Sequence, residues 1–130
     1  MFQEAISVAD QLATKIGIIK NQRDNRRVRI ANFFDKVGTC LEKIVKSIDA
    51  NESANDPIEE LETYVESFSI AVGDIIGFEL TERLVESLRI VFNKENFKKL
   101  LDLPEQEMAE SKKTLKLAAT KFVNLWSALQ

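Results

Sequence analysis

The sequence predicts an all-α protein, an up-and-down bundle of four to five antiparallel helices in one domain that spans residues 1–130. Apolar residues recur three and four positions apart along almost the whole chain, the spacing that gathers them on one face of a helix. No segment alternates apolar and polar residues as a half-buried strand does. The length suits one hydrophobic core and is short for two.

Two apolar stripes predict two helices in the N-terminal part of the chain. The first stripe steps by four and three through Phe2, Ile6, Ala9, Ala13 and Ile16. The second keeps the same alternation through Ile30, Phe34, Val37, Leu41, Ile44 and Ile48. Such alternation is typical of the seam of an antiparallel bundle. Asp24 and Asn25 are candidates to cap the second helix, and the sequence leaves open whether the two helices are continuous.

The middle of the chain carries clear signals for helix boundaries. The segment 49–56, rich in Asn, Ser and Asp, has no periodicity and predicts a loop. After it, Asp56, Pro57 and Glu59 form the pattern of a capping acid, a first-turn proline and a glutamate that reaches back to the cap. The apolar residues of the helix that follows are Leu61, Val65, Phe68, Val72 and Ile75. Gly77 is its expected end, because glycine adopts the left-handed cap conformation without strain.

Two more stripes complete the chain. One consists of Leu80, Leu84, Leu88 and Val91. Residues 97–101 either extend this helix or form a separate turn, and Asp102, Pro104 and Glu105 again resemble a helix start. The last helix presents Met108, Leu115, Ala118, Phe122, Leu125 and Leu129. Its apolar face is wide enough to be covered by more than one neighbour.

The composition excludes most known types of catalytic site. The chain has no histidine and one cysteine, Cys40, whereas most nucleophilic, proton-transfer and transition-metal sites need histidine or paired thiolates. The glycines are scattered and form no phosphate-binding loop. We therefore expect no enzyme and no cofactor. One cysteine forms no intrachain disulfide, so Cys40 is expected to be a buried apolar residue in a reducing compartment.

The sequence also bears on localisation. Residues 1–13 carry Glu4 and Asp10 and lack the basic and apolar blocks of a secretory signal. No apolar run approaches the roughly 20 residues that span a bilayer. We expect a cytoplasmic protein with no membrane partner.

Charge is distributed unevenly along the chain, whose net charge is -3. Residues 1–50 sum to +3, residues 51–93 to -8 and residues 94–130 to +2. This distribution is typical of helices that neutralise one another when they pack side by side. A nucleic-acid-binding domain is normally basic overall, so we expect no nucleic-acid partner.

An arginine cluster is the best candidate for a binding surface. The cluster comprises Arg23, Arg26, Arg27 and Arg29. It stands at the start of the second stripe, where cations oppose the helix dipole and do not help the helix to begin. In one interpretation the arginines pair with the acidic middle helices. In the other they bind an acidic protein partner or another anion, because a guanidinium group donates two parallel hydrogen bonds to a carboxylate.

The carboxylates provide an alternative of another class. Glu59 and Glu62 stand three residues apart, and so do Glu79 and Glu82 on the next predicted helix. If the four converged, their oxygens could hold Mg²⁺ for a nucleotide-handling enzyme. Glu59 is better explained by the capping pattern. The discriminating observation is whether these side chains converge on one point or splay into solvent.

A longer pattern connects the chain with a known group of proteins. It comprises residues 26–41 (RRVRIANFFDKVGTCL), then Pro57, Leu61 and Tyr64, then Lys121 and Phe122. The pattern resembles small helical proteins and N-terminal domains of cyanobacteria and other bacteria, some of them joined to signalling or conflict-response effector modules. The resemblance implies an adaptor or effector-associated domain and brings no catalytic residues with it. We therefore expect a non-enzymatic protein-interaction module of bacterial signalling or regulation, with a structural homo-oligomer as a further alternative.

Overall fold

The computed structural model describes residues 1–130 as seven α-helices without a strand, which confirms the all-α prediction. The helices are α1 (Gln3–Ala13), α2 (Ile16–Lys20), α3 (Asp24–Asp49), α4 (Asn55–Ile76), α5 (Phe78–Val91), α6 (Lys94–Leu101) and α7 (Glu105–Ala128). No helix combines the length and the apolar character that crossing a membrane requires.

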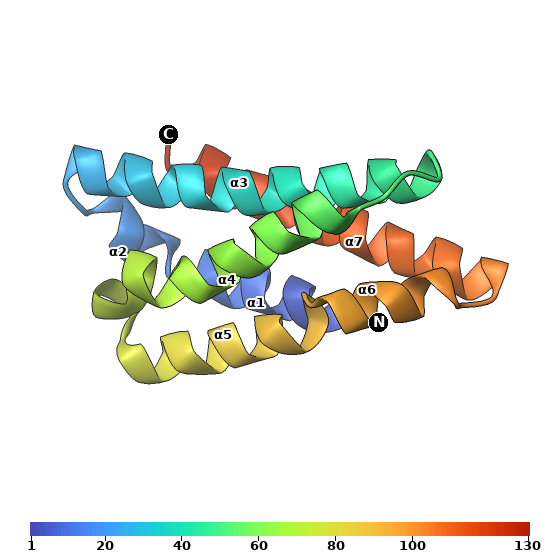
Figure 1. The fold of residues 1–130 in the computed structure, drawn as a ribbon. Helices are drawn as coiled ribbons and strands as arrows, with labels where there is room; N and C mark the ends of the chain where they lie inside the picture. The colour runs from blue at the N-terminus through green and yellow to red at the C-terminus, as the bar shows by residue number, and fades with distance from the viewer.

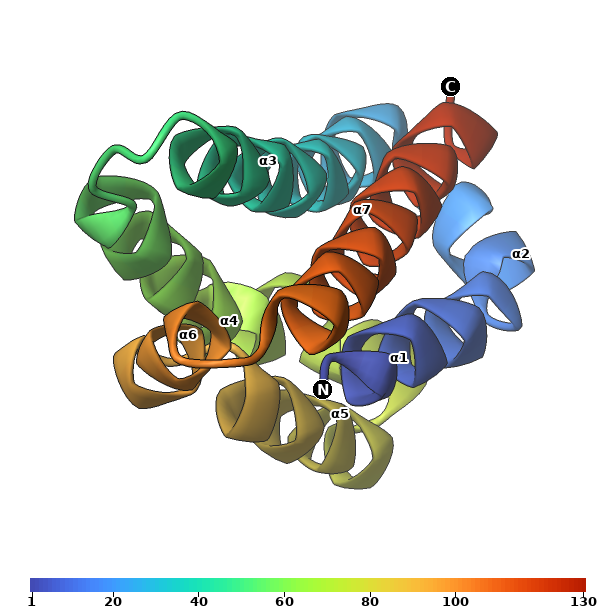
Figure 2. The ribbon, with the colours of Figure 1, turned by 90° about the vertical axis from the view of Figure 1, so that its right-hand side faces the viewer.

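The five longest helices enclose a common core. α3 packs on α4, α4 on α5, α5 on α1 and α1 on α7, and α7 returns to α3. Figure 2 shows these helices following one another around a shared centre. The two short helices lie against this ring, α2 in contact with α3 and α4, and α6 in contact with α4 and α7 (Figure 1). The buried apolar residues form one cluster of 32 side chains.

Two consecutive phenylalanines on α3 pack against different helices, α7 and α4. Phe34 on α3 and Phe122 on α7 are fully buried, with their ring centroids 6.4 Å apart. Phe33, the preceding residue, turns toward α4, where its ring centroid lies 5.7 Å from that of Phe68. The second predicted stripe is buried in the core except for its last residue, Ile48, which is partly buried. α3 presents different faces to α7 and α4.

The contact between α3 and α7 is close because α3 carries a glycine there. A Cβ atom at Gly38 would lie 2.8 Å from Cγ2 of Val123 and 3.0 Å from the carbonyl oxygen of Ala119. Both distances are shorter than normal van der Waals contact, so a larger residue would require α7 to shift. Gly38 thus sets the distance between the two longest helices of the fold.

The N-terminal stripe forms two helices rather than one. α1 ends at Ala13, and the Thr14 hydroxyl that follows donates to the Gln11 carbonyl at 2.6 Å. This side-chain bond competes with the regular backbone ladder. The chain then restarts as α2, which buries Ile19. Residues 21–23 separate α2 from α3, so the two predicted helices are not continuous.

Two predicted helix caps are wrong. Asp24 is the first residue of α3 and forms an ion pair with Arg27 at 3.2 Å, and no side chain caps this helix. α4 begins one residue ahead of Asp56, again without a side-chain cap. The Glu59 carboxylate accepts a hydrogen bond from Lys94 Nζ of α6 at 2.8 Å. Glu59 therefore binds a neighbouring helix instead of its own N-terminus.

Other predicted boundaries are confirmed. Gly77 ends α4 with φ at 97° and directly precedes α5. Residues 97–101 belong to a separate helix, α6, and do not extend α5. Asn93 starts that helix, because its Oδ1 accepts the backbone N–H of Asn96 at 2.8 Å. α7 begins at Glu105, within its predicted start.

Gly38 and Gly17 form a matched pair for testing the close contact between α3 and α7. A methyl group at Gly38 would collide with α7, whereas one at Gly17 would meet nothing within 4 Å. Both residues are helical, so alanine gains about 1 kcal/mol of helix propensity at either site. We expect Gly17→Ala to raise the midpoint of thermal unfolding and Gly38→Ala to lower it, because overpacking typically costs about 1 to 3 kcal/mol. A higher midpoint in both variants would contradict the close contact.

Candidate functional site

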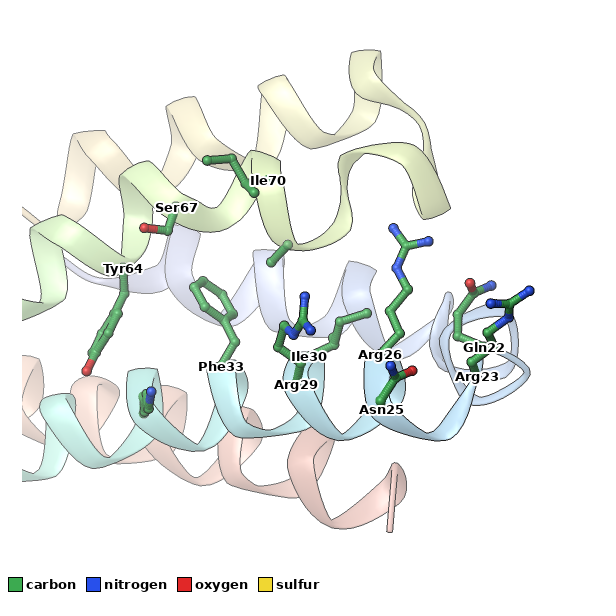
Figure 3. Close-up of a pocket in the computed structure, with 12 residues that line it drawn as sticks. Gln22, Arg23, Asn25, Arg26, Arg29, Ile30, Phe33, Tyr64, Ser67 and Ile70 are labelled. Carbon is green, nitrogen blue, oxygen red and sulfur yellow. The ribbon is translucent and has the colours of Figure 1, made fainter.

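An open groove of about 940 Å³ runs between α3 and α4 on the outer side of the molecule (Figure 3). Cationic, polar and apolar side chains line it together. The cations are Arg23, Arg26, Arg29 and Lys36. The apolar and aromatic surface comes from Ile30, Phe33, Tyr64, Ile70 and Ala71. The groove therefore includes three of the four arginines that the sequence singles out.

Helical geometry explains why Arg27 lies outside the groove. At about 100° per residue, Arg26 and Arg29 lie within about 40° of Phe33 around the axis of α3. Arg27 lies about 120° from Phe33 and does not line the groove. It is half-buried and paired with Asp24, and its buried Nε–H has no hydrogen-bond partner. The sequence cluster thus divides into three groove residues and one residue that packs elsewhere.

α4 supplies the opposite wall. Tyr64 lies edge-on to Phe33, with ring centroids 6.2 Å apart, and the two side chains lie next to one another between α4 and α3 (Figure 3). The Tyr64 hydroxyl donates to Glu60 Oε1 at 2.8 Å. Ile70 borders the same groove with 87% of its surface exposed. The two walls therefore leave an apolar and aromatic floor open to solvent.

One cation of the groove is neutralised by the fold, and three are not. Arg26 reaches across to form an ion pair with Asp74 at the end of α4. This hydrogen bond raises the pKa of Arg26 and lowers the pKa of Asp74, because it favours the charged form of each. The cations without an ion-pair partner are Arg23, Arg29 and Lys36. The groove is therefore positively charged. Of its arginines only Arg26 forms an ion pair with a carboxylate of the acidic segment 51–93.

The nucleophilic side chains beside the groove are poorly ionised. Burial raises the pKa of the Cys40 thiol to about 12. Burial and the hydrogen bond to Glu60 raise the pKa of Tyr64 to about 12. A thiol or a phenol acts as a nucleophile mainly through its anion, and neither group forms an anion near neutral pH.

The structure does not bring together the four glutamates of the enzyme alternative. Glu59 is bound to Lys94, while Glu79 and Glu82 line a separate exposed hollow along α5. Nowhere do three or more Asp, Glu, Cys or His side chains gather in a group that could hold a metal ion. Glu59, Glu62, Glu79 and Glu82 thus form no shared set of oxygen ligands.

Sequence reasoning missed Lys36, Phe33 and Tyr64 as groove residues. A signal for the first two was present, because Arg26, Arg29, Phe33 and Lys36 repeat at steps of three and four beside the core stripe. The mixture of charge and apolar surface in this second stripe distinguishes it from an ordinary solvated face. No local pattern indicates that Tyr64 of α4 faces it.

Comparisons with known proteins give no indication of function. No protein-family model, curated protein or solved structure matches this chain. The resemblance to small bacterial helical domains therefore stays a prediction. Function has to be inferred from the shape, charge and lining of the groove.

The Cys40 thiol should report unfolding and not a reactive site. Its side chain is 1% exposed, and its raised pKa keeps it protonated. We expect the native protein at about pH 8 to react with Ellman's reagent far more slowly than the urea-unfolded chain, whose thiol has an ordinary pKa of about 8.5. Absorbance of the released thiolate measures both rates. Similar rates for native and unfolded protein would show that Cys40 is accessible and ionised.

Proposed function

We propose that this chain is a non-enzymatic protein-interaction module of bacterial signalling or regulation that works in the cytoplasm. Its docking site is the groove between α3 and α4, and its partner is a protein segment that carries carboxylates next to apolar side chains. One observation supports the proposal most strongly: three cations without carboxylate partners, Arg23, Arg29 and Lys36, lie along the α3 side of a groove that also has apolar surface open to solvent. We further propose that the ring of helices is an up-and-down bundle that serves as a rigid frame for this groove.

The free cations favour an acidic partner. Exposed ion pairs contribute little to folding, so leaving Arg23 and Arg29 unpaired costs the fold little. Their planar guanidinium groups suit carboxylates, to which they donate two parallel hydrogen bonds. Positive charge around the groove also speeds the encounter with an acidic surface, and salt weakens that effect.

The apolar floor favours a protein segment over a small anion. A phosphate ion would use only the charges, and would leave Ile70 and the exposed parts of Phe33 and Tyr64 in water. A protein segment covers apolar and charged surface together and gains from both. Aromatic and arginine side chains at the middle of a contact are also the residues that most often dominate binding energy.

The two free arginines provide the central test of this proposal. We expect a random peptide library, displayed and selected on the immobilised protein, to yield peptides that combine Asp or Glu with large apolar residues. Arg23→Gln together with Arg29→Gln should weaken the binding of a selected peptide on the order of tenfold, because two charge-assisted contacts are lost. Fluorescence polarisation at low and high salt measures the affinity.

A charge-matched variant controls for the loss of net charge. Lys99→Gln together with Lys113→Gln removes two exposed cations outside the groove. We expect it to bind like the unmodified protein, and both double variants to keep its melting temperature. Selected peptides without acidic residues, or equal binding by both double variants, would refute the proposal.

Removal of Asp74 should strengthen the same binding. Asp74→Asn releases Arg26 from its ion pair and adds a fourth free cation to the groove. We expect tighter binding of the selected acidic peptide and a steeper dependence on salt. Asp102→Asn changes an exposed acid outside the groove and should have no effect. Unchanged affinity in Asp74→Asn would show that Arg26 does not contact the peptide.

A further inference from the structure

Both walls of the groove carry a helical repeat on their open side. On α3 the residues are Arg26, Arg29, Phe33 and Lys36, at steps of three, four and three. On α4 the residues are Tyr64, Ser67, Ala71 and Asp74, at the same steps. Alternating steps of three and four are typical of a seam that faces another helix. All of these residues except Asp74 line the groove, and Asp74 forms the ion pair with Arg26.

We infer that the groove holds an amphipathic α-helix of the partner, with two carboxylates seven residues apart and large apolar residues between them. This inference rests on the proposed function, because it presumes an acidic protein segment in the same groove. The two carboxylates bind Arg29 and Lys36. The apolar residues pack on Phe33 and Tyr64.

The spacing of the cations sets the spacing of the acids. Arg29 and Lys36 are seven residues apart on one side of α3, which is about 10.5 Å at about 1.5 Å per residue. Two acids seven residues apart on a docked helix are separated by the same distance and lie on the same face. Phe33 stands between the two cations, so it meets the residues between the two acids.

The length of the groove fits a helix of about three turns. Its lining within α3 runs from Asn25 to Lys36, which corresponds to about 16.5 Å of helix axis and to a docked helix of about 12 residues. α3 and α4 lie close together near the loop at residues 50–54 and separate toward their other ends (Figures 1 and 2).

The α4 wall permits close approach. Ser67 and Ala71 are small side chains, so a helix can lie close to α4 at these positions. Ile70, the most exposed large apolar residue of the chain, borders the groove and gains cover from the docked helix.

Backbone hydrogen bonding favours a helix over an extended segment. Two acids about three residues apart on an extended chain would also match the distance between Arg29 and Lys36. Such a chain would place its backbone N–H and C=O groups against Phe33 and Tyr64, and this all-helical protein offers no sheet edge to pair with them. A helix satisfies its backbone groups internally, so it can lie on an apolar floor without that penalty.

Synthetic labelled peptides of about 18 residues test the inference by fluorescence polarisation. The parent peptide has two glutamates seven residues apart, leucines three and four residues after the first glutamate, and alanine and glutamine elsewhere. A hydrocarbon staple on the opposite face keeps it helical. One control has the same composition with the glutamates five residues apart, about 140° around the helix. Another carries a central proline and no staple, which prevents a continuous helix.

We expect the parent peptide to bind on the order of tenfold more tightly than the five-residue control, and the proline peptide to bind weakest. Arg29→Gln and Lys36→Gln should each weaken parent binding several-fold, and Lys99→Gln should not. Changing one peptide glutamate to glutamine should remove the effect of one of the two groove variants and preserve the effect of the other. This pairing assigns each acid to its cation without relying on a single protein variant.

The contrary outcomes are distinguishable from one another. If the proline peptide binds as tightly as the parent and Arg29→Gln still weakens it, the groove takes an extended acidic segment, and only the helix inference fails. If sedimentation shows self-association that Arg29→Gln abolishes, the occupant is a second copy of this chain, and the inference also fails. If no acidic peptide binds and display selection yields none, the proposed function fails with it.

Discussion

The close contact of α3 with α7 at Gly38 is the constraint on which the rest of the fold depends. It places one face of α3 in the core, where Phe34 meets Phe122. Because successive helical residues are about 100° apart, Phe33 then faces α4 and not α7. With two faces of α3 occupied in this way, the side that carries Arg29 is left at the molecular surface. The groove is therefore a consequence of how α3 is shared between two neighbours.

Ion pairs between helices determine which charges remain available. Glu66 accepts two hydrogen bonds from Arg89, each of 2.8 Å, and so joins α4 to α5. The other pairs that join different helices are Lys94 with Glu59, Lys112 with Asp49, Lys121 with Asp10 and Arg26 with Asp74. All are partly exposed, so each contributes little to stability. Their main effect is to neutralise charged side chains. Three cations of the groove have no such ion pair, and they lie together beside its apolar surface.

The groove combines positive charge with apolar surface. The nucleophilic groups next to it, Cys40 and Tyr64, each have a pKa of about 12, and the acidic side chains are dispersed over the surface. In the proposed complex an acidic helix adds to the seam between α3 and α4. Binding would thus extend the helix packing that already holds the bundle together, with salt-sensitive charge pairs to select the partner.

The sequence by itself determined the helical class and the five longest helices, because a repeat of 3.6 residues is a local property of the chain. It also placed the end of α4 at Gly77, where the positive φ needs only a local glycine. It did not show that α2 is separate from α1. It did not reveal that Glu59 binds Lys94, since the two residues are 35 positions apart. Nor did it reveal that Lys36 joins the groove while Arg27 stays outside, because the crossing of α4 over α3 decides which side of α3 faces the groove. Only the tertiary structure decided which charged side chains form ion pairs and which do not. The reason is that these pairs depend on how all the helices pack and not on the spacing of residues along one helix.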